Sequence, residues 1–139
     1  MNNQAKYFHA FNLIDDFGPK SFQKLLDFFG SLEIAWQKDI DDLRKSGIRE
    51  NLIEKIALKR KKINPDQEFE KVIEKNIEIV TVLDPNYPRL LKEIYNPPAL
   101  LYIKGQFKEE DEFSLAVVGT RKISTYGQQV TPKSYKNFL

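Results

Sequence analysis

The chain contains one short apolar run that stops at a glycine and a cation: Leu115 to Val118, then Gly119, Thr120 and Arg121. Four consecutive apolar residues between turn residues are typical of a strand buried on both faces, as in a parallel sheet. Gly119 allows a sharp turn, after which backbone N–H groups, hydroxyls and cations can meet an anion. The pattern predicts a strand and a phosphate-binding turn. The alternative is a strand with a polar turn that binds nothing, because one such motif has low specificity.

The predicted anion site consists of small, hydroxylated and basic residues that directly follow the run. They are Gly119, Thr120, Arg121, Lys122, Ser124, Thr125, Tyr126 and Gly127. Arg121 can direct two N–H bonds to one phosphate, and the hydroxyl of Thr120 can donate beside it. The 21 residues from Gly119 to Leu139 hold four Lys or Arg side chains and no carboxylate, which gives this segment a net charge of +4.

A helix is expected after this turn, with Ser124 or Thr125 as its capping residue. Pro132 is expected to disrupt a helix that begins at Tyr126, because proline lacks the N–H that the helix interior requires. Alternatively, Thr131 caps a later and shorter helix with Pro132 in its first position.

The composition limits the classes of function. With 139 residues, 41% hydrophobic and 30% charged, the chain can fold as one medium domain or two small ones. A net charge of only +2 means that any affinity for nucleic acid must come from a local patch. The absence of cysteine and the single histidine exclude a disulfide framework, a thiol nucleophile and a Cys/His zinc cluster. We therefore predict no cofactor and no metal. No apolar run is long enough for a membrane span, and a soluble cytoplasmic protein is expected.

The amino-terminal part has helical periodicity. Phe22, Leu25, Leu26 and Phe29 recur at the spacing of one helical face, after a turn in which Pro19 suits the first helical position. Asn64 and Pro65 break the helical pattern. The sequence therefore predicts a helical domain over residues 1–63 and a second domain over residues 68–139.

The turn from Ile14 to Lys20 resembles half of a helix-hairpin-helix element, whose backbone N–H groups often meet a DNA phosphate. Such hairpins usually carry a glycine where this chain has Asp16, next to Asp15. Two carboxylates repel a phosphate, which favours a purely structural hairpin.

The segment from Arg44 to Lys62 carries eight basic residues against Glu50 and Glu54, a local charge of +6. This basic segment could contact DNA without sequence preference. More commonly, such a run is a solvated helix end whose cations complement the helix dipole.

Two further strands are predicted, at residues 77–82 and 99–103, with a short helix between them at residues 88–95. Tyr87, Tyr95 and Tyr102 lie among apolar neighbours there, and we assign them to core packing rather than to stacking on bases.

Several separated motifs resemble the DNA-processing protein A family (DprA, also called Smf). They are Tyr87-Pro88, the pair Leu90-Leu91, Ile94, Pro97-Pro98, Leu101-Tyr102, Gly105, the stretch Ala116-Val-Val-Gly-Thr-Arg121, and Thr125-Tyr-Gly127. The resemblance covers about residues 77–130. It implies a fold of the α + α/β class: a helical domain of the SAM-like or helix-hairpin-helix type, followed by the beginning of a Rossmann-like parallel sheet.

The resemblance also implies a function. Members of the family are cytoplasmic proteins of natural transformation that bind single-stranded DNA, protect it during uptake and load the recombinase RecA. They are not known as enzymes, and Gly119, Thr120 and Arg121 match their phosphate-gripping loop. Full-length relatives are homodimeric, and their further strands and their dimer and RecA surfaces are expected beyond Leu139, so the chain is expected to be truncated or a fragment.

Two other functions compete with this one. Rossmann-like relatives include enzymes that hydrolyse nucleotides, although the chain lacks the Gly-Gly-x-Gly-Thr phosphate loop of such enzymes. The chain could instead be a helical module that contacts protein partners.

Overall fold

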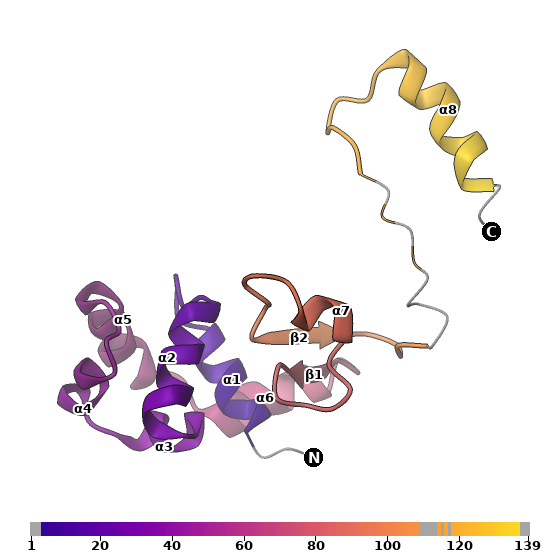
Figure 1. The fold of residues 1–139 in the computed structure, drawn as a ribbon. Coiled ribbons are helices and arrows are strands. Elements are labelled where there is room, and N and C mark those ends of the chain that lie inside the picture. Colours follow the sequence, from indigo (N-terminus) through magenta and orange to yellow (C-terminus); the bar gives the residue numbers. More distant parts are fainter. Residues whose placement is uncertain (1–3, 109–113, 115, 117, 137–139) are drawn as a thin grey trace. The chain divides into compact units, whose positions relative to one another are not determined.

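The computed structural model describes residues 4–108, 114, 116 and 118–136. The chain divides into two compact units, Met1–Gln106 and Phe107–Leu139. Figure 1 traces the elements within each of them.

The first unit begins with a series of short helices joined by tight turns. They are α1 (Ala5–Asn12), α2 (Pro19–Phe29), α3 (Leu32–Gln37), α4 (Ile40–Lys45) and α5 (Glu50–Arg60). Pro19 starts α2, as predicted, and Gly30 ends it in the left-handed conformation with φ of 73°. Side chains cap the next two helices, because Ser31 accepts a hydrogen bond from the N–H of Glu33 and Asp39 accepts one from the N–H of Asp42. The predicted helical character of this part is confirmed.

An aromatic cluster forms the centre of the helical core. Phe8 of α1 stacks on Phe22 of α2 with ring centroids 5.4 Å apart. The ring centroid of Phe11 lies 4.9 Å from that of Phe17 and 4.9 Å from that of Trp36. Offset and edge-to-face ring pairs of this kind add stability beyond the area that they bury. Leucine and isoleucine side chains from α2 to α5 complete the core, and the fully buried ones are Leu25, Leu32, Leu43, Leu52, Ile53 and Ile56.

The same core continues into the segment that follows α5. Helix α6 (Pro65–Ile73) packs against α1, and so does strand β1 (Glu78–Thr81). Ile79 and Leu100 belong to the same buried cluster as the phenylalanines of α1. Packing therefore joins both sides of the expected boundary at residues 63–68, and the division into domains there stays a prediction.

The sheet of the first unit has two antiparallel strands. Strand β1 pairs with β2 (Leu100–Ile103), Glu78 lying opposite Ile103 and Thr81 opposite Leu100. The short helix α7 (Arg89–Lys92) lies between them in the chain. Both strands lie within the predicted ranges, but they run in opposite directions. The parallel sheet expected from the Rossmann-like pattern is thus not formed by the described residues.

The apolar run before Gly119 does not form the predicted strand in the part that the structure describes. Leu115 and Val117 lie outside the described residues, while Ala116 and Val118 are exposed and belong to no strand. Val118 is 92% exposed. A strand needs neighbours to pair its backbone groups, and Ala116 and Val118 pair with none among the residues described.

The three tyrosines differ from one another. Tyr87 is buried, and its hydroxyl donates to the carbonyl oxygen of Pro98 at 2.8 Å, as the packing assignment requires. Tyr102 is 44% exposed, so it lies outside the core, although its hydroxyl is hydrogen-bonded to His9. For Tyr95 the assignment is wrong, because its side chain is 93% exposed. Helix α7 ends at Lys92, so the helical spacing that pointed to packing does not extend to this residue.

The second unit contains helix α8 (Thr125–Lys136), with Pro132 in its interior. The prediction that Pro132 would break a helix begun near Tyr126 is therefore wrong, as is the later start at Thr131. Proline removes only its own N–H bond to the carbonyl of residue 128, and the helix continues on both sides at an energetic cost.

None of the helices in the described part of the chain is long and apolar enough to cross a membrane.

Candidate nucleic-acid interface

The eight residues of the predicted anion site lie together in the second unit. Residues 119–124 form a loop without regular structure that leads directly into α8, and residues 125–127 form the first turn of that helix (Figure 1). We refer to residues 119–127 as the Gly119 loop. Seven of the eight predicted residues are exposed, and Gly127 is partly buried.

Hydrogen bonds within the segment give the loop its local form. The hydroxyl of Thr120 donates to the carbonyl oxygen of Lys122 at 2.6 Å. The hydroxyl oxygen of Ser124 accepts a hydrogen bond from the N–H of Gly127 at 3.2 Å. Of the two predicted capping residues, it is Ser124 that caps α8.

Gly127 allows the preceding residues to fold closely over the first turn. A Cβ atom at this position would lie 3.0 Å from Cγ1 of Ile123 and 3.5 Å from the hydroxyl oxygen of Ser124. Any larger side chain would have to displace Ile123, so glycine preserves the contact between loop and helix.

The electrostatics of the Gly119 loop favour an anion. Within the described residues, neither the guanidinium of Arg121 nor the ammonium of Lys122 makes an ion pair, and both side chains are exposed. No carboxylate follows Glu112 in the sequence. The first turn of α8 contains no acidic residue. Ser124 takes the N–H of Gly127, which leaves the N–H groups of Thr125 and Tyr126 and the positive end of the helix dipole available to an anion. No group of three His, Cys, Asp or Glu side chains in the described part of the chain could hold a metal ion.

The hairpin between α1 and α2 is organised differently. Asp16 adopts a left-handed φ of 65°, the geometry that glycine usually supplies. Its carboxylate pairs with Lys55 of α5, and the carboxylate of Asp15 lies 3.3 Å from the Nζ atom of Lys59. Both carboxylates therefore stay at the turn, where they repel a phosphate. The contacts support the structural interpretation of this hairpin, and its identity as a helix-hairpin-helix element stays a prediction.

The basic segment from Arg44 to Lys62 makes many of its contacts within its own unit. Arg44 pairs with Asp41 and Glu50, Lys45 pairs with Asp42, and Arg60 donates to the carbonyl oxygens of Trp36 and Lys38. Burial lowers the pKa of Arg60. Among the described residues, the cations of the segment that make no such contact are Arg49, Lys61 and Lys62.

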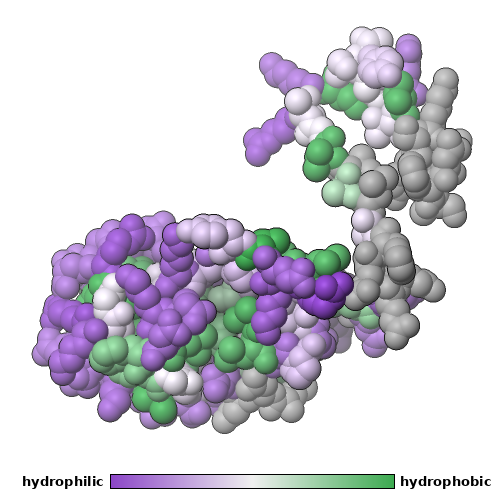
Figure 2. Space-filling model, viewed as in Figure 1, coloured by the Kyte–Doolittle hydropathy of each residue, from purple (hydrophilic) through white to green (hydrophobic). Residues whose placement is uncertain are grey.

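Figure 2 shows hydrophilic side chains over much of the region of α4 and α5 on the face in view. The internal ion pairs reduce the charge that this surface offers to DNA. The Gly119 loop, whose cations lack such partners among the described residues, is the stronger candidate.

Sequence reasoning missed one exposed pair. The Nζ atom of Lys20 lies 5.6 Å from the ring centroid of Tyr95, beside a cavity between α2 and the loop before β2. The structure ends α7 at Lys92, three residues before Tyr95, and no local feature of the sequence marked this end.

Comparisons with known proteins agree on one family. The family model described as DNA recombination-mediator protein A matches residues 78–139, a range that includes the Gly119 loop. A protein named Smf from Synechocystis is 34% identical over 137 residues, which cover 95% of this chain and 34% of the relative.

Two shorter matches carry the same kind of name. Protein Smf of Borreliella burgdorferi is 46% identical over 56 residues, covering 40% of this chain and 18% of the relative. The DNA processing protein DprA of Bacillus subtilis is 38% identical over 58 residues, covering 41% of this chain and 20% of the relative. No solved structure matches significantly.

The chain spans about a third of the length of the Synechocystis relative, and a smaller share of the other two. The motifs recognised in the sequence, the family model and the three relatives all lead to one assignment. The chain belongs to the DNA-processing protein A (DprA/Smf) family.

Proposed function

We propose that this chain binds single-stranded DNA through the Gly119 loop, as part of a protein that processes DNA for recombination. The observation that carries the proposal is the combination of an exposed Arg121 and Lys122, without ion pairs among the described residues, at the capped start of α8. The Bacillus subtilis relative, which is named DNA processing protein DprA, supports it.

The chemistry of the loop suits a phosphate of the DNA backbone. Arg121 can donate two parallel N–H bonds to one phosphate, the geometry in which arginine exceeds lysine. The N–H groups of Thr125 and Tyr126 lie in the first turn of α8, where they have no acceptor within the helix. An anion at this position also meets the positive end of the helix dipole.

Binding of this kind has little sequence preference and depends strongly on salt. Contacts to phosphates release counterions, so affinity falls as salt rises. Phosphate contacts position a nucleic acid without reading its bases. We therefore expect oligonucleotides of different sequence to bind with similar affinity at one salt concentration.

The remaining parts of the proposal rest on the family resemblance. We propose that the full-length protein protects incoming DNA in the cytoplasm during natural transformation, passes it to RecA and acts as a homodimer. We also propose that it is not an enzyme. Turnover of a nucleotide or cleavage of DNA by the pure chain, abolished by one substitution in the chain, would contradict that last statement.

Arg121→Ala tests the proposed site. We expect it to weaken binding of a fluorescent single-stranded oligonucleotide by about 10- to 100-fold, as the loss of charge-assisted hydrogen bonds requires. Lys61→Ala is the matched control, because Lys61 is also exposed and makes no ion pair among the residues described. Lys61→Ala should change the affinity for the oligonucleotide by less than about threefold. Equal losses for the two variants, measured by fluorescence anisotropy at one salt concentration, would contradict the assignment of the Gly119 loop.

A further inference from the structure

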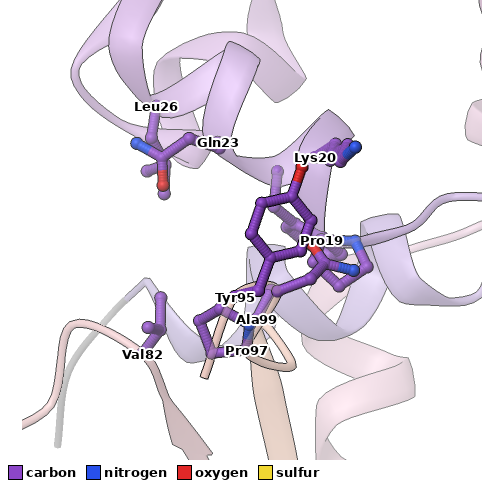
Figure 3. A pocket seen from close by; sticks show the side chains of 10 residues that line it. Pro19, Lys20, Gln23, Leu26, Val82, Tyr95, Pro97 and Ala99 are labelled. Carbon is purple, nitrogen blue, oxygen red and sulfur yellow. The ribbon is translucent and has the colours of Figure 1, made fainter. Parts of the chain in front are cut away.

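A cavity of about 240 Å³ lies in the first unit, between α2 and the loop that precedes β2. Figure 3 shows the ring of Tyr95 extending from that loop toward Lys20, with Gln23 and Leu26 of α2 on the other side of the opening. Val82 and Pro97 form its lower wall in this view. The cavity is separate from the Gly119 loop, which belongs to the second unit.

Tyr95 does not contribute to the core of this unit. Its side chain is 93% exposed, whereas Tyr87, eight residues earlier, is 4% exposed and hydrogen-bonded. An aromatic ring in solvent leaves a large apolar face uncovered, and such faces are commonly used for binding. The ammonium of Lys20, 5.6 Å from the centroid of the Tyr95 ring, makes a cation–π interaction with it.

The polar groups around the cavity suit an anionic ligand with hydrogen-bonding edges. No aspartate or glutamate lines the cavity, and Lys20 makes no ion pair among the described residues. Two amide side chains, Gln23 and Asn96, also line it. The amide nitrogen of Gln23 donates to Asp27 at 2.7 Å, which fixes the side chain and leaves its carbonyl oxygen as an acceptor. The other walls are apolar, including Leu26, Val82 and Pro97.

We propose that this cavity is a second contact site for single-stranded nucleic acid, in which one base stacks on Tyr95 while Lys20 binds an adjacent phosphate. The inference rests on the proposed DNA-binding function but assigns different residues to it. A base offers a flat apolar face to the tyrosine ring and polar edges to the two amides. Stacking on aromatic side chains beside a cation is how proteins bind single strands without sequence preference.

The size and charge of the cavity favour a base over a polypeptide. Sites that enclose drug-sized ligands measure roughly 300–1,000 Å³, and this cavity, at about 240 Å³, is smaller. It suits one flat ring system, with the rest of the strand outside. A proline-rich peptide could also lie against Tyr95 and Pro97, but it would not supply an anion to the ammonium of Lys20, which makes no ion pair with the residues described.

Photocrosslinking of the intact chain tests the site directly. An oligonucleotide of thymidines with one 5-iododeoxyuridine is irradiated with the protein, and the adducts are located by mass spectrometry. Iodinated bases react with aromatic side chains on which they stack. We expect an adduct on the peptide that contains Tyr95, and its loss in Lys20→Gln at moderate salt.

Affinity measurements on two variants separate stacking from the hydroxyl group. Tyr95→Ala should weaken binding of the unmodified oligonucleotide by about 5- to 100-fold, while Tyr95→Phe, which keeps the ring, should bind like the original chain. Both substitutions should leave folding unchanged, because the side chain contributes nothing to the core.

The outcomes distinguish this inference from the proposed function. If Arg121→Ala weakens binding but Tyr95→Ala does not, and no adduct forms at Tyr95, the inference is overturned and the Gly119 loop stands. If the Tyr95 adduct forms while Arg121→Ala binds normally, the inference stands and the proposed loop site fails. An oligomer that dissociates on Tyr95→Ala, without a DNA adduct at Tyr95, would make a second copy of the chain the occupant and would also overturn the inference.

Discussion

His9, the single histidine of the chain, connects α1 to the sheet. It is 6% exposed, and its Nδ1 atom lies 2.7 Å from the hydroxyl of Tyr102 on β2. The side-chain amide of Asn12 donates to the same hydroxyl oxygen at 3.1 Å. A neutral imidazole that accepts the hydroxyl proton at Nδ1 satisfies both of these contacts. Burial lowers the pKa of His9, and a weaker effect of Glu68 opposes the shift.

This residue makes stability depend on pH. The folded pKa of His9 lies below its ordinary value of 6.5, so below that pH the unfolded chain binds more protons than the folded one. The free energy of unfolding should therefore decrease as pH falls through about 6.5 and level off below the folded pKa. The total decrease is about 1.4 kcal/mol for each unit by which the folded pKa lies below the unfolded one. His9→Asn, which keeps an acceptor near Nδ1, should remove most of this dependence. Urea unfolding between pH 7.5 and 5 measures it, and an unchanged slope in the variant would contradict the account.

At the scale of elements, α8 shows how an unfavourable residue persists in a helix. Pro132 lies inside Thr125–Lys136, although an interior proline costs about 3 kcal/mol relative to alanine. Pro65 occupies a different position, the start of α6, where Asn64 caps the helix and no N–H is needed. The two prolines therefore form a matched pair within one chain.

Pro132→Ala should increase the helical content of the second unit, because it restores the missing hydrogen bond and removes the clash with the preceding turn. Pro65→Ala should change helical content little, since the first position of a helix makes no such bond. Far-UV circular dichroism at 222 nm compares the variants. A larger gain in helical content for Pro65→Ala than for Pro132→Ala would show that Pro132 does not limit the helical content of α8.

The elements also show which structural features could be predicted from sequence. Apolar spacing and Pro19 were sufficient to predict α2, because helix periodicity and helix starts are local properties. The direction of strand pairing is not local, and the antiparallel partner of β1 could not be identified from its own residues. The exposure of Tyr95 was missed for the same reason: burial depends on what the fold brings alongside.

At the scale of the whole molecule, the chain combines a well-packed first unit with a second unit that carries the Gly119 loop and α8. The core around Phe8, Phe11 and Phe22 extends into the two-stranded sheet. The Gly119 loop carries Arg121 and Lys122, which make no ion pair with any residue that the structure describes. The residues of that site could be predicted because they are consecutive in the sequence. Their role in binding DNA remains a proposal.

Nuclear magnetic resonance shows directly whether DNA contacts the Gly119 loop. A thymidine oligonucleotide is titrated into the isotope-labelled chain, and amide shift changes are mapped along the sequence. We expect the largest changes at Thr120, Arg121 and the first turn of α8, with a smaller set near Tyr95 and Lys20. Both sets should weaken as salt increases. Saturable shift changes confined to residues 44–62, with none in residues 119–127, would contradict this expectation.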